Sequence, residues 1–260
     1  MTDLANEAVA PRMGMSTALA ALAAIPAALL AAAPFMTPSA AEPPSPMAAG
    51  LLARPGASAY KASPEQSAQR FAAEDGSLRF TLDRSGPLPL LHFEGQSEIL
   101  ALRSTAGPRG DEFLKTDTGL LVLRVSALGG MTVYPHAGSA GLAVTALGEG
   151  KTFASPASPA GGLAARLTQL SSETSRTLGR SVAFEAQAFP PAISAVAADA
   201  AERAAEALMR SENAQVSRVI IIPGAAPDVS RQAGVLRVTV APPLGYAGRP
   251  STAALAAAAR

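Results

Sequence analysis

Cysteine and tryptophan are absent from this 260-residue sequence, and tyrosine occurs only three times. Without cysteine the chain has no disulfide, no thiolate nucleophile, no cysteine zinc site and no iron–sulfur cluster. A lipoprotein anchor is excluded as well, because it requires a cysteine at the cleavage point. The scarcity of aromatic side chains argues against a carbohydrate cleft, where sugar rings usually stack on aromatic rings.

A strong charge of either sign is missing too. The 21 lysines and arginines nearly balance the 20 acidic residues, so the formal net charge is +1. A field this weak does not favour nucleic acid or anionic lipid as a partner. No pattern in the sequence predicts a cofactor or a metal ion. The hydrophobic content of 48% is that of a globular protein.

The first 41 residues have the three-part pattern of a cleavable signal peptide. Arg12 precedes a run, residues 18–33, that contains only alanine, leucine, isoleucine and proline. The small residues Ser39, Ala40 and Ala41 then provide a cleavage site. The sequence therefore predicts a periplasmic or secreted protein with no membrane attachment after cleavage.

Two alternatives to this leader remain open. Residues 13–36 are long enough for an uncleaved membrane anchor, although Pro26 and Pro34 interrupt them. Translation could also start at Met13 or Met15, because acidic residues are unusual at the start of a signal peptide.

The pattern after the leader predicts an α+β fold. Residues 42–70 are rich in proline and alanine and are expected to form a disordered linker. Residues 71–150 are expected to form an antiparallel β-meander, as a small barrel or half-sandwich. A loop at 151–162 leads to an α+β region at 163–260, with two helices and two to three strands. We expect the two regions to pack as one domain.

Short alternating segments at 77–82, 88–93, 98–102, 111–115, 121–125, 131–134 and 142–144 indicate the strands of the β region. Residues 111–115 and 121–125 form a hairpin across a turn that ends in Gly119. One face of the sheet should be apolar and buried, and it should carry Leu78, Phe80, Leu82, Leu91, Phe93, Leu123, Val125 and Val133.

Helical spacing begins after the loop. Leucines recur from Leu163 to Leu178, and Gly179 is a helix stop. A second helix follows Pro190 and Pro191, and its charged side is interpreted as a solvated face with Asp199–Arg203 and Glu206–Arg210 pairs. Strands are expected at 182–186, 216–222 and 234–240, and Ser251 caps a terminal helix. Strict βαβ alternation is not evident, so a doubly wound nucleotide-binding fold is not expected.

Several motifs approach a known chemistry without completing it. Residues 145–152 resemble a phosphate-binding loop, but Thr145 stands where glycine is required and prolines follow Thr152. Ser58-x-x-Lys61 and Ser211-x-Asn213 match two elements of the penicillin-binding set, but no Lys-Thr-Gly follows them. Arg109-Gly110-Asp111 is the tripeptide of adhesion ligands and is interpreted as a turn.

The side chains suited to acid–base chemistry are few. The two histidines, His92 and His136, lack the paired spacing of a metal site, and neither has an evident orienting carboxylate. Carboxylates gather in the β region, where a hydrolase could use two of them or where they could occupy turns and strand edges. These carboxylates are Glu94, Glu98, Asp111, Glu112 and Asp117.

The β region and the C-terminus resemble an uncharacterised family of exported alphaproteobacterial proteins, known as a domain of unknown function. The similar segments are residues 108–114, Asp117-x-Gly119, 122–125, 129–135 and 248–251. The resemblance runs from Phe71 to the C-terminus. It implies a bacterial envelope protein and brings no catalytic residues with it.

The sequence therefore favours a non-enzymatic periplasmic or secreted module that binds an envelope or protein partner. The alternative is a periplasmic hydrolase that uses carboxylates or a histidine. A third option is an anchored scaffold that oligomerises through alanine-rich helices. The candidate binding residues are Arg109, Asp111 and Arg249, which are charged residues in glycine- or proline-containing turns.

Overall fold

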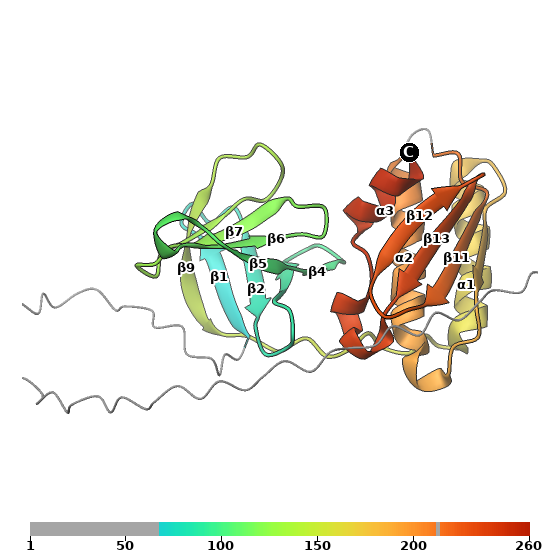
Figure 1. The fold of residues 1–260 in the computed structure, drawn as a ribbon, viewed down its shortest axis with the longest axis horizontal. Helices are drawn as coiled ribbons and strands as arrows, with labels where there is room; N and C mark the ends of the chain where they lie inside the picture. Colours follow the sequence, from blue (N-terminus) through green and yellow to red (C-terminus); the bar gives the residue numbers. More distant parts are fainter. Residues whose placement is uncertain (1–67, 212–213) are drawn as a thin grey trace, which may run out of the picture. The chain divides into compact units, whose positions relative to one another are not determined.

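The computed structural model describes residues 68–211 and 214–260 (Figure 1). The predicted signal peptide (1–41) and Ser58-x-x-Lys61 lie outside these residues, as do nearly all of the predicted linker and the last two residues of Ser211-x-Asn213. The fold is α+β, as the sequence predicts. An antiparallel sheet comes first, and a half with helices and a smaller sheet follows.

Nine strands form the first sheet, in the order β4-β3-β2-β1-β9-β8-β7-β6-β5, and every neighbouring pair is antiparallel. The strands are β1 (Gln69–Ala73), β2 (Arg79–Asp83), β3 (Leu90–Phe93), β4 (Ile99–Ala101), β5 (Arg103–Ala106), β6 (Glu112–Lys115), β7 (Leu121–Val125), β8 (Met131–Val133) and β9 (Leu142–Glu149). The two edge strands, β4 and β5, are separated only by Leu102, which is fully buried. The sheet must therefore curl until its edges meet, which makes it a near-barrel.

Alternating apolar residues fill this near-barrel. Phe71 stacks on Phe80 with ring centroids 5.2 Å apart, and Phe93 meets Phe80 edge to face. The predicted apolar face is confirmed except at Val125, which is only half-buried and lies outside the core cluster. The buried members of the cluster are Phe71, Phe80, Leu82, Leu91, Phe93, Leu102, Leu114, Val122, Leu123 and Val133.

The hairpin of β6 and β7 is confirmed, with Gly119 at φ 82° in its turn. Strands β1 and β5 were not predicted. Strand β9 is longer than predicted and covers Thr145 to Glu149, the first part of the segment that resembles a phosphate-binding loop. Residues 150–159 form no helix, so the helix start that such a loop requires is missing.

The C-terminal half contains a four-stranded sheet in the order β10-β11-β13-β12. Strands β10, β11 and β13 are parallel, and β12 is antiparallel to β13. The elements are α1 (Gly162–Leu178), β10 (Ala183–Ala186), α2 (Ser194–Arg210), β11 (Arg218–Pro223), β12 (Asp228–Gln232), β13 (Val235–Val240), the 3₁₀ helix η3 (Pro242–Gly248) and α3 (Thr252–Ala259).

Helices cover one face of this second sheet. Val219, Ile221, Leu236 and Val238 alternate along β11 and β13 and are fully buried, together with the apolar face of α2. The residues between them remain exposed or half-exposed. The unit β10–α2–β11 is a βαβ crossover that the sequence did not reveal. The half has two layers and not the three of a doubly wound fold.

Helix α1 and its stop are confirmed, since Gly179 adopts a left-handed conformation at φ 63°. The prediction of a solvated charged face on α2 is wrong at Asp199 and Arg203. Arg203 is only 7% exposed and donates to Ser97 of the β half, and Asp199 bonds Arg249. The Glu206–Arg210 ion pair is present. On this face, water is replaced by contacts with residues about 50 to 106 positions away in the sequence. Local helical spacing cannot reveal such contacts.

Candidate functional site

The three candidate residues lie in two separate places. Arg109 is exposed in a turn and has a left-handed backbone at φ 59°. Asp111 follows in the same turn, is 8% exposed and accepts hydrogen bonds from Arg124 and from the backbone of Ala127. Arg249 has different partners and shares none of them with Asp111.

Asp111 closes a turn. Its Oδ2 accepts from Nε of Arg124 at 2.7 Å and its Oδ1 from the amide of Ala127 at 3.1 Å. These bonds lower the pKa of Asp111 below its ordinary value, the Arg124 bond most strongly. The tripeptide that contains Asp111 thus forms a turn, as the sequence predicts.

Arg249 joins the two halves of the molecule. Its Nε donates to Asp199 on α2, and its Nη1 donates to Oε1 of Glu98 at 3.3 Å. Its Nη2 donates to the carbonyl of Ile99 on β4 at 3.2 Å, and a further contact of Nη1 reaches the carbonyl of Pro250 at 3.4 Å. The side chain is only 2% exposed, so its position is fixed on every side.

Two carboxylates of the β half bind the start of α3. Glu98 accepts from the amide of Thr252 at 2.8 Å. Asp117 accepts from the amide of Ser251 at 2.7 Å and from its hydroxyl at 2.6 Å. The predicted cap is confirmed, because Oγ of Ser251 accepts from the amide of Ala254. The positive end of the helix dipole favours these negative charges.

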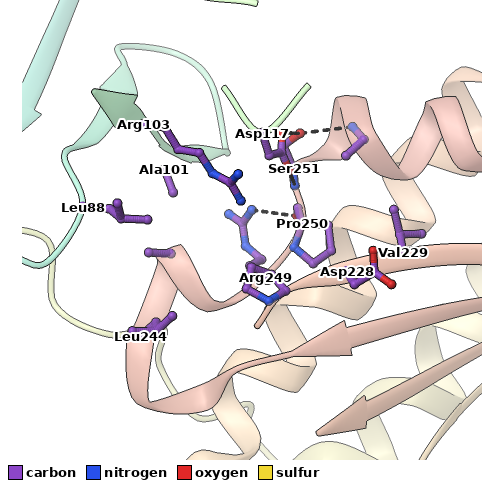
Figure 2. Close-up of a pocket in the computed structure, with 13 residues that line it drawn as sticks. Leu88, Ala101, Arg103, Asp117, Asp228, Val229, Leu244, Arg249, Pro250 and Ser251 are labelled. Atoms are coloured by element: carbon purple, nitrogen blue, oxygen red, sulfur yellow. Dashed lines mark hydrogen bonds between the residues drawn. The ribbon is translucent and has the colours of Figure 1, made fainter. Parts of the chain in front are cut away.

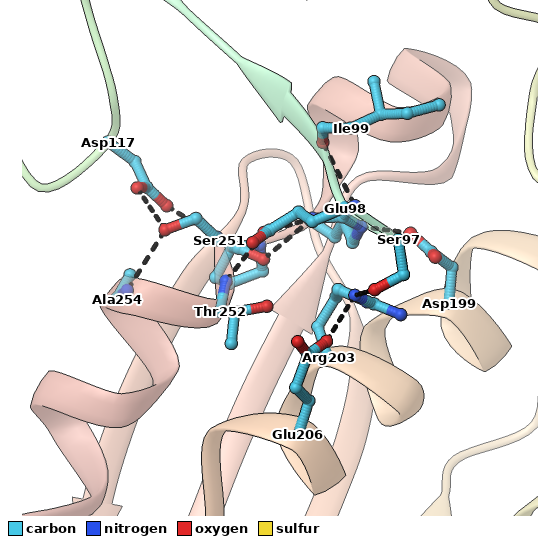
Figure 3. A network of polar contacts seen from close by, with 12 residues as sticks. Ser97, Glu98, Ile99, Asp117, Asp199, Arg203, Glu206, Ser251, Thr252 and Ala254 are labelled. Carbon is cyan, nitrogen blue, oxygen red and sulfur yellow. Dashed lines mark hydrogen bonds and ion pairs between the residues drawn. The ribbon is translucent and has the colours of Figure 1, made fainter. Parts of the chain in front are cut away.

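We call this group of contacts the polar seam (Figure 3). It consists of Ser97, Glu98, Asp117, Asp199, Arg203, Arg249, Ser251 and Thr252. The contacts that cross between the halves pair polar groups beside β4 or in the β6–β7 turn with α2, with Arg249 at the end of η3, or with the start of α3. The seam therefore fixes the wall of any cavity that lies beside it.

Such a cavity lies at the polar seam and has a volume of about 400 Å³, within the range of small-molecule sites (Figure 2). We call it the seam pocket. Its lining is Leu88, Ala101, Arg103, Asp117, Pro227, Asp228, Val229, Leu244, Ala247, Arg249, Pro250, Ser251 and Ala254. Sequence reasoning identified Arg249 but missed Arg103 and Asp228, which have no local motif around them.

Four charged side chains line the seam pocket, and they are not equivalent. Arg249 and Asp117 are engaged within the polar seam. Arg103 and Asp228 are exposed, and no hydrogen bond or ion pair to either side chain occurs within residues 68–211 and 214–260. One cation and one anion of the pocket are thus left available to a ligand.

Several of the groups that a hydrolase could use are engaged in other contacts. His92 Nε2 contacts the carbonyl of Gln96, and His136 Nδ1 contacts that of Ala137. Neither histidine is hydrogen-bonded to a carboxylate in the described part of the chain. Glu112 is engaged by Arg84 and Ser104. Burial alone would raise the pKa of Glu112, but the bonds from Ser104 and Arg84 outweigh it and lower the pKa.

Within residues 68–211 and 214–260, no group of three or more histidine, aspartate or glutamate side chains is placed to hold a metal ion. None of the helices there has the length and apolar character needed to cross a bilayer.

The fold and site define an α+β protein in which a near-barrel and a two-layer α/β half meet at a polar seam beside a pocket. A family model described as "Domain of unknown function (DUF4908)" matches residues 49–259, so the chain belongs to this family. The resemblance to an uncharacterised domain family is thereby confirmed. No curated protein and no solved structure matches the chain.

Proposed function

We propose that the protein is exported and acts in the periplasm or outside the cell as a binding module, with the seam pocket as its ligand site. The apolar leader and its small-residue cleavage site support export. The observation that carries the binding role is the seam pocket itself, which has a fixed polar wall and two available charges.

The wall of the pocket supports tight binding because it is already ordered. Before any ligand arrives, Arg249 is held by partners from both halves, and Asp117 is held by Ser251 of the C-terminal half. A ligand would therefore lose little affinity to the ordering of these side chains. Most of the remaining lining is apolar, as in ordinary small-molecule sites.

Binding without turnover is favoured because the pocket lacks an evident nucleophile and base. Ser251 is its only serine, and this hydroxyl already donates to Asp117 and caps α3. No histidine lines the pocket, and the carboxylate within reach of this hydroxyl, Asp117, is also bound to the amide of Ser251 at the start of α3. The ligand would come from the envelope or from a protein partner.

Export is tested by fractionating the native host and determining the N-terminus of the purified protein. We expect the mature chain to begin at Glu42 and to be found outside the cytoplasm. An intact leader on protein that fractionates with the cytosol would overturn this part of the proposal.

The binding role is tested with Ala101→Phe, which fills the pocket from β4. Envelope extracts fractionated by size are screened by thermal shift, and a stabilising fraction should act on the wild type and not on Ala101→Phe. The matched control is Ala106→Phe, at an exposed position of β5 outside the pocket lining. Hydrolysis of peptidoglycan, peptides or esters that a single substitution abolishes would refute a binding-only role.

A further inference from the structure

The seam pocket carries one unused charge of each sign beside apolar side chains. Resting on the proposed binding function, we propose that its ligand is a short zwitterionic peptide with an apolar side chain. Arg103 binds the peptide carboxylate and Asp228 binds its amine.

The carboxylate subsite is formed by two arginines. Figure 2 shows the guanidinium groups of Arg103 and Arg249 pointing toward one another. The charge of Arg249 is neutralised by Glu98 and Asp199, so Arg103 supplies the attraction for an anion and Arg249 supplies an N–H donor. Arginine is also the side chain best shaped to bind a carboxylate, through two parallel N–H donors.

Arg249 has a donor to spare for this anion. A guanidinium carries five N–H groups. The contacts of Arg249 use Nε once, Nη1 twice and Nη2 once, which leaves one N–H of Nη2. Arg103 uses none of its donors within the described residues. Together the two arginines can therefore donate several charge-assisted hydrogen bonds to one carboxylate.

The amine subsite is Asp228, the first residue of β12. Its exposed carboxylate has no partner within residues 68–211 and 214–260. The other aspartate of the pocket, Asp117, is already bound to Ser251 and cannot accept an amine as freely. A ligand with only negative charge would meet Asp228 as a repulsive group, so a zwitterion fits the lining better than a plain anion.

An apolar side chain of the peptide would cover Leu88, Val229 and Leu244. Among the described residues, Leu244 is one of the few large apolar side chains that are exposed, at 36%. Covering such a group removes apolar surface from water and favours binding. The volume of about 400 Å³ suits two or three residues and not a folded protein.

The test uses isothermal titration calorimetry of the full-length mature protein with the dipeptide L-alanyl-L-leucine. Two matched probes are its N-acetyl and C-amide derivatives, each of which removes one charge. We expect the dipeptide to bind and each derivative to bind about tenfold more weakly or worse, because each loses a charge-assisted hydrogen bond.

Variants then assign each charge to its side chain. Arg103→Gln should lower the affinity for the dipeptide about tenfold, and the variant should bind the dipeptide and its C-amide equally. Asp228→Asn should lower the affinity to a similar extent, and that variant should bind the dipeptide and its N-acetyl derivative equally. Arg79→Gln and Glu94→Gln, at exposed positions outside the pocket, should leave affinity unchanged.

The outcomes separate this inference from the proposed function. No binding of the dipeptide, or equal binding of all three probes, overturns the peptide inference. If an envelope fraction still stabilises the wild type and not Ala101→Phe, the pocket remains a ligand site for another chemistry. If neither the dipeptide nor any fraction acts through the pocket, both proposals fail.

Discussion

Arg249 is the residue on which the junction of the two halves depends most. It is a buried cation that two carboxylates, from Glu98 and Asp199, neutralise. A buried charge of this kind is costly to leave unpaired. Its removal should therefore destabilise the protein through the carboxylates that remain.

We expect Arg249→Gln to lower the free energy of unfolding by about 3–5 kcal/mol, the usual cost of breaking a buried ion pair from one side. Urea denaturation followed by circular dichroism measures this. Arg79→Gln replaces an exposed arginine of β2 and should change stability by less than about 0.5 kcal/mol. Equal effects of the two substitutions would contradict the role given to Arg249.

Asp111 should make stability depend on pH. The pKa of Asp111 is lowered in the folded protein, chiefly by the bond from Arg124. Its contribution to the free energy of unfolding is therefore fully present when the pH is above the ordinary pKa of 3.8. That contribution is lost as the pH falls through the lower pKa of the folded state. Asp111→Asn should therefore lower the melting temperature at neutral pH, and the difference from the wild type should shrink in acid.

Thermal melts between pH 7 and pH 2 test this dependence. Arg124→Gln removes the same interaction from the other side. Its melting temperature should also differ from that of the wild type at neutral pH, and this difference should shrink in acid. A difference that stays constant across this range would show that Asp111 is not an ionic partner of Arg124.

At the scale of the element, Gly179 ends α1 in a conformation that side chains disfavour. Its φ is 63°, and no atom lies within 4 Å of the position that a Cβ would take. The cost of Gly179→Ala is therefore one of backbone conformation alone, about 1–2 kcal/mol. Chemical denaturation should show this loss, whereas Gly86→Ala, whose φ is not in the left-handed region, should be nearly neutral.

Elements with a strong local pattern were predictable from the sequence. Helix α1 follows its leucine spacing, and the β6–β7 hairpin follows its glycine turn. Strand β5 was missed because Arg103–Ala106 has no large apolar residue and all four positions are exposed. Strand β1 was missed because Gln69–Ala73 has a single large apolar residue, Phe71, and its pairing with the distant β9 leaves no local pattern. Local periodicity contains no information about such partners.

The candidate site was predicted only in part for the same reason. Arg249 was selected as a charged residue next to a proline, and it does line the seam pocket. Its partners, Glu98 and Asp199, are 151 and 50 positions away. The charged side of α2 was interpreted as solvated because helical spacing shows that a face is polar but not what covers it.

At the scale of the whole molecule, the polar seam should couple the stabilities of the two halves. Each half has its own apolar core, so the coupling depends on contacts such as those of Glu98 and Asp117 with α3. We expect the wild type to melt in a single transition. The double variant Glu98→Gln, Asp117→Asn should melt in two transitions separated by about 5 °C or more.

Differential scanning calorimetry resolves these transitions, and hydrogen exchange with mass spectrometry assigns each to a half. The control is Glu74→Gln with Glu94→Gln, two exposed carboxylates of the β half. A single transition in the seam variant, with both halves exchanging together, would mean that other contacts couple the halves.

The order of strands in the near-barrel also bears on how quickly the chain reaches its native state. Strand β1 lies beside β9, and Gln69 pairs with Glu149. Strand β1 therefore gains its second neighbour only after β9, the last strand of the near-barrel, has been synthesised. The hairpins β2–β3 and β6–β7 join close neighbours and can form early. Loop-closure entropy makes the long-range pairing the slow step. A ribosome-bound chain that ends before residue 142 would therefore hold β1 with one side unpaired, and this is the stage at which the nascent protein is most exposed to aggregation.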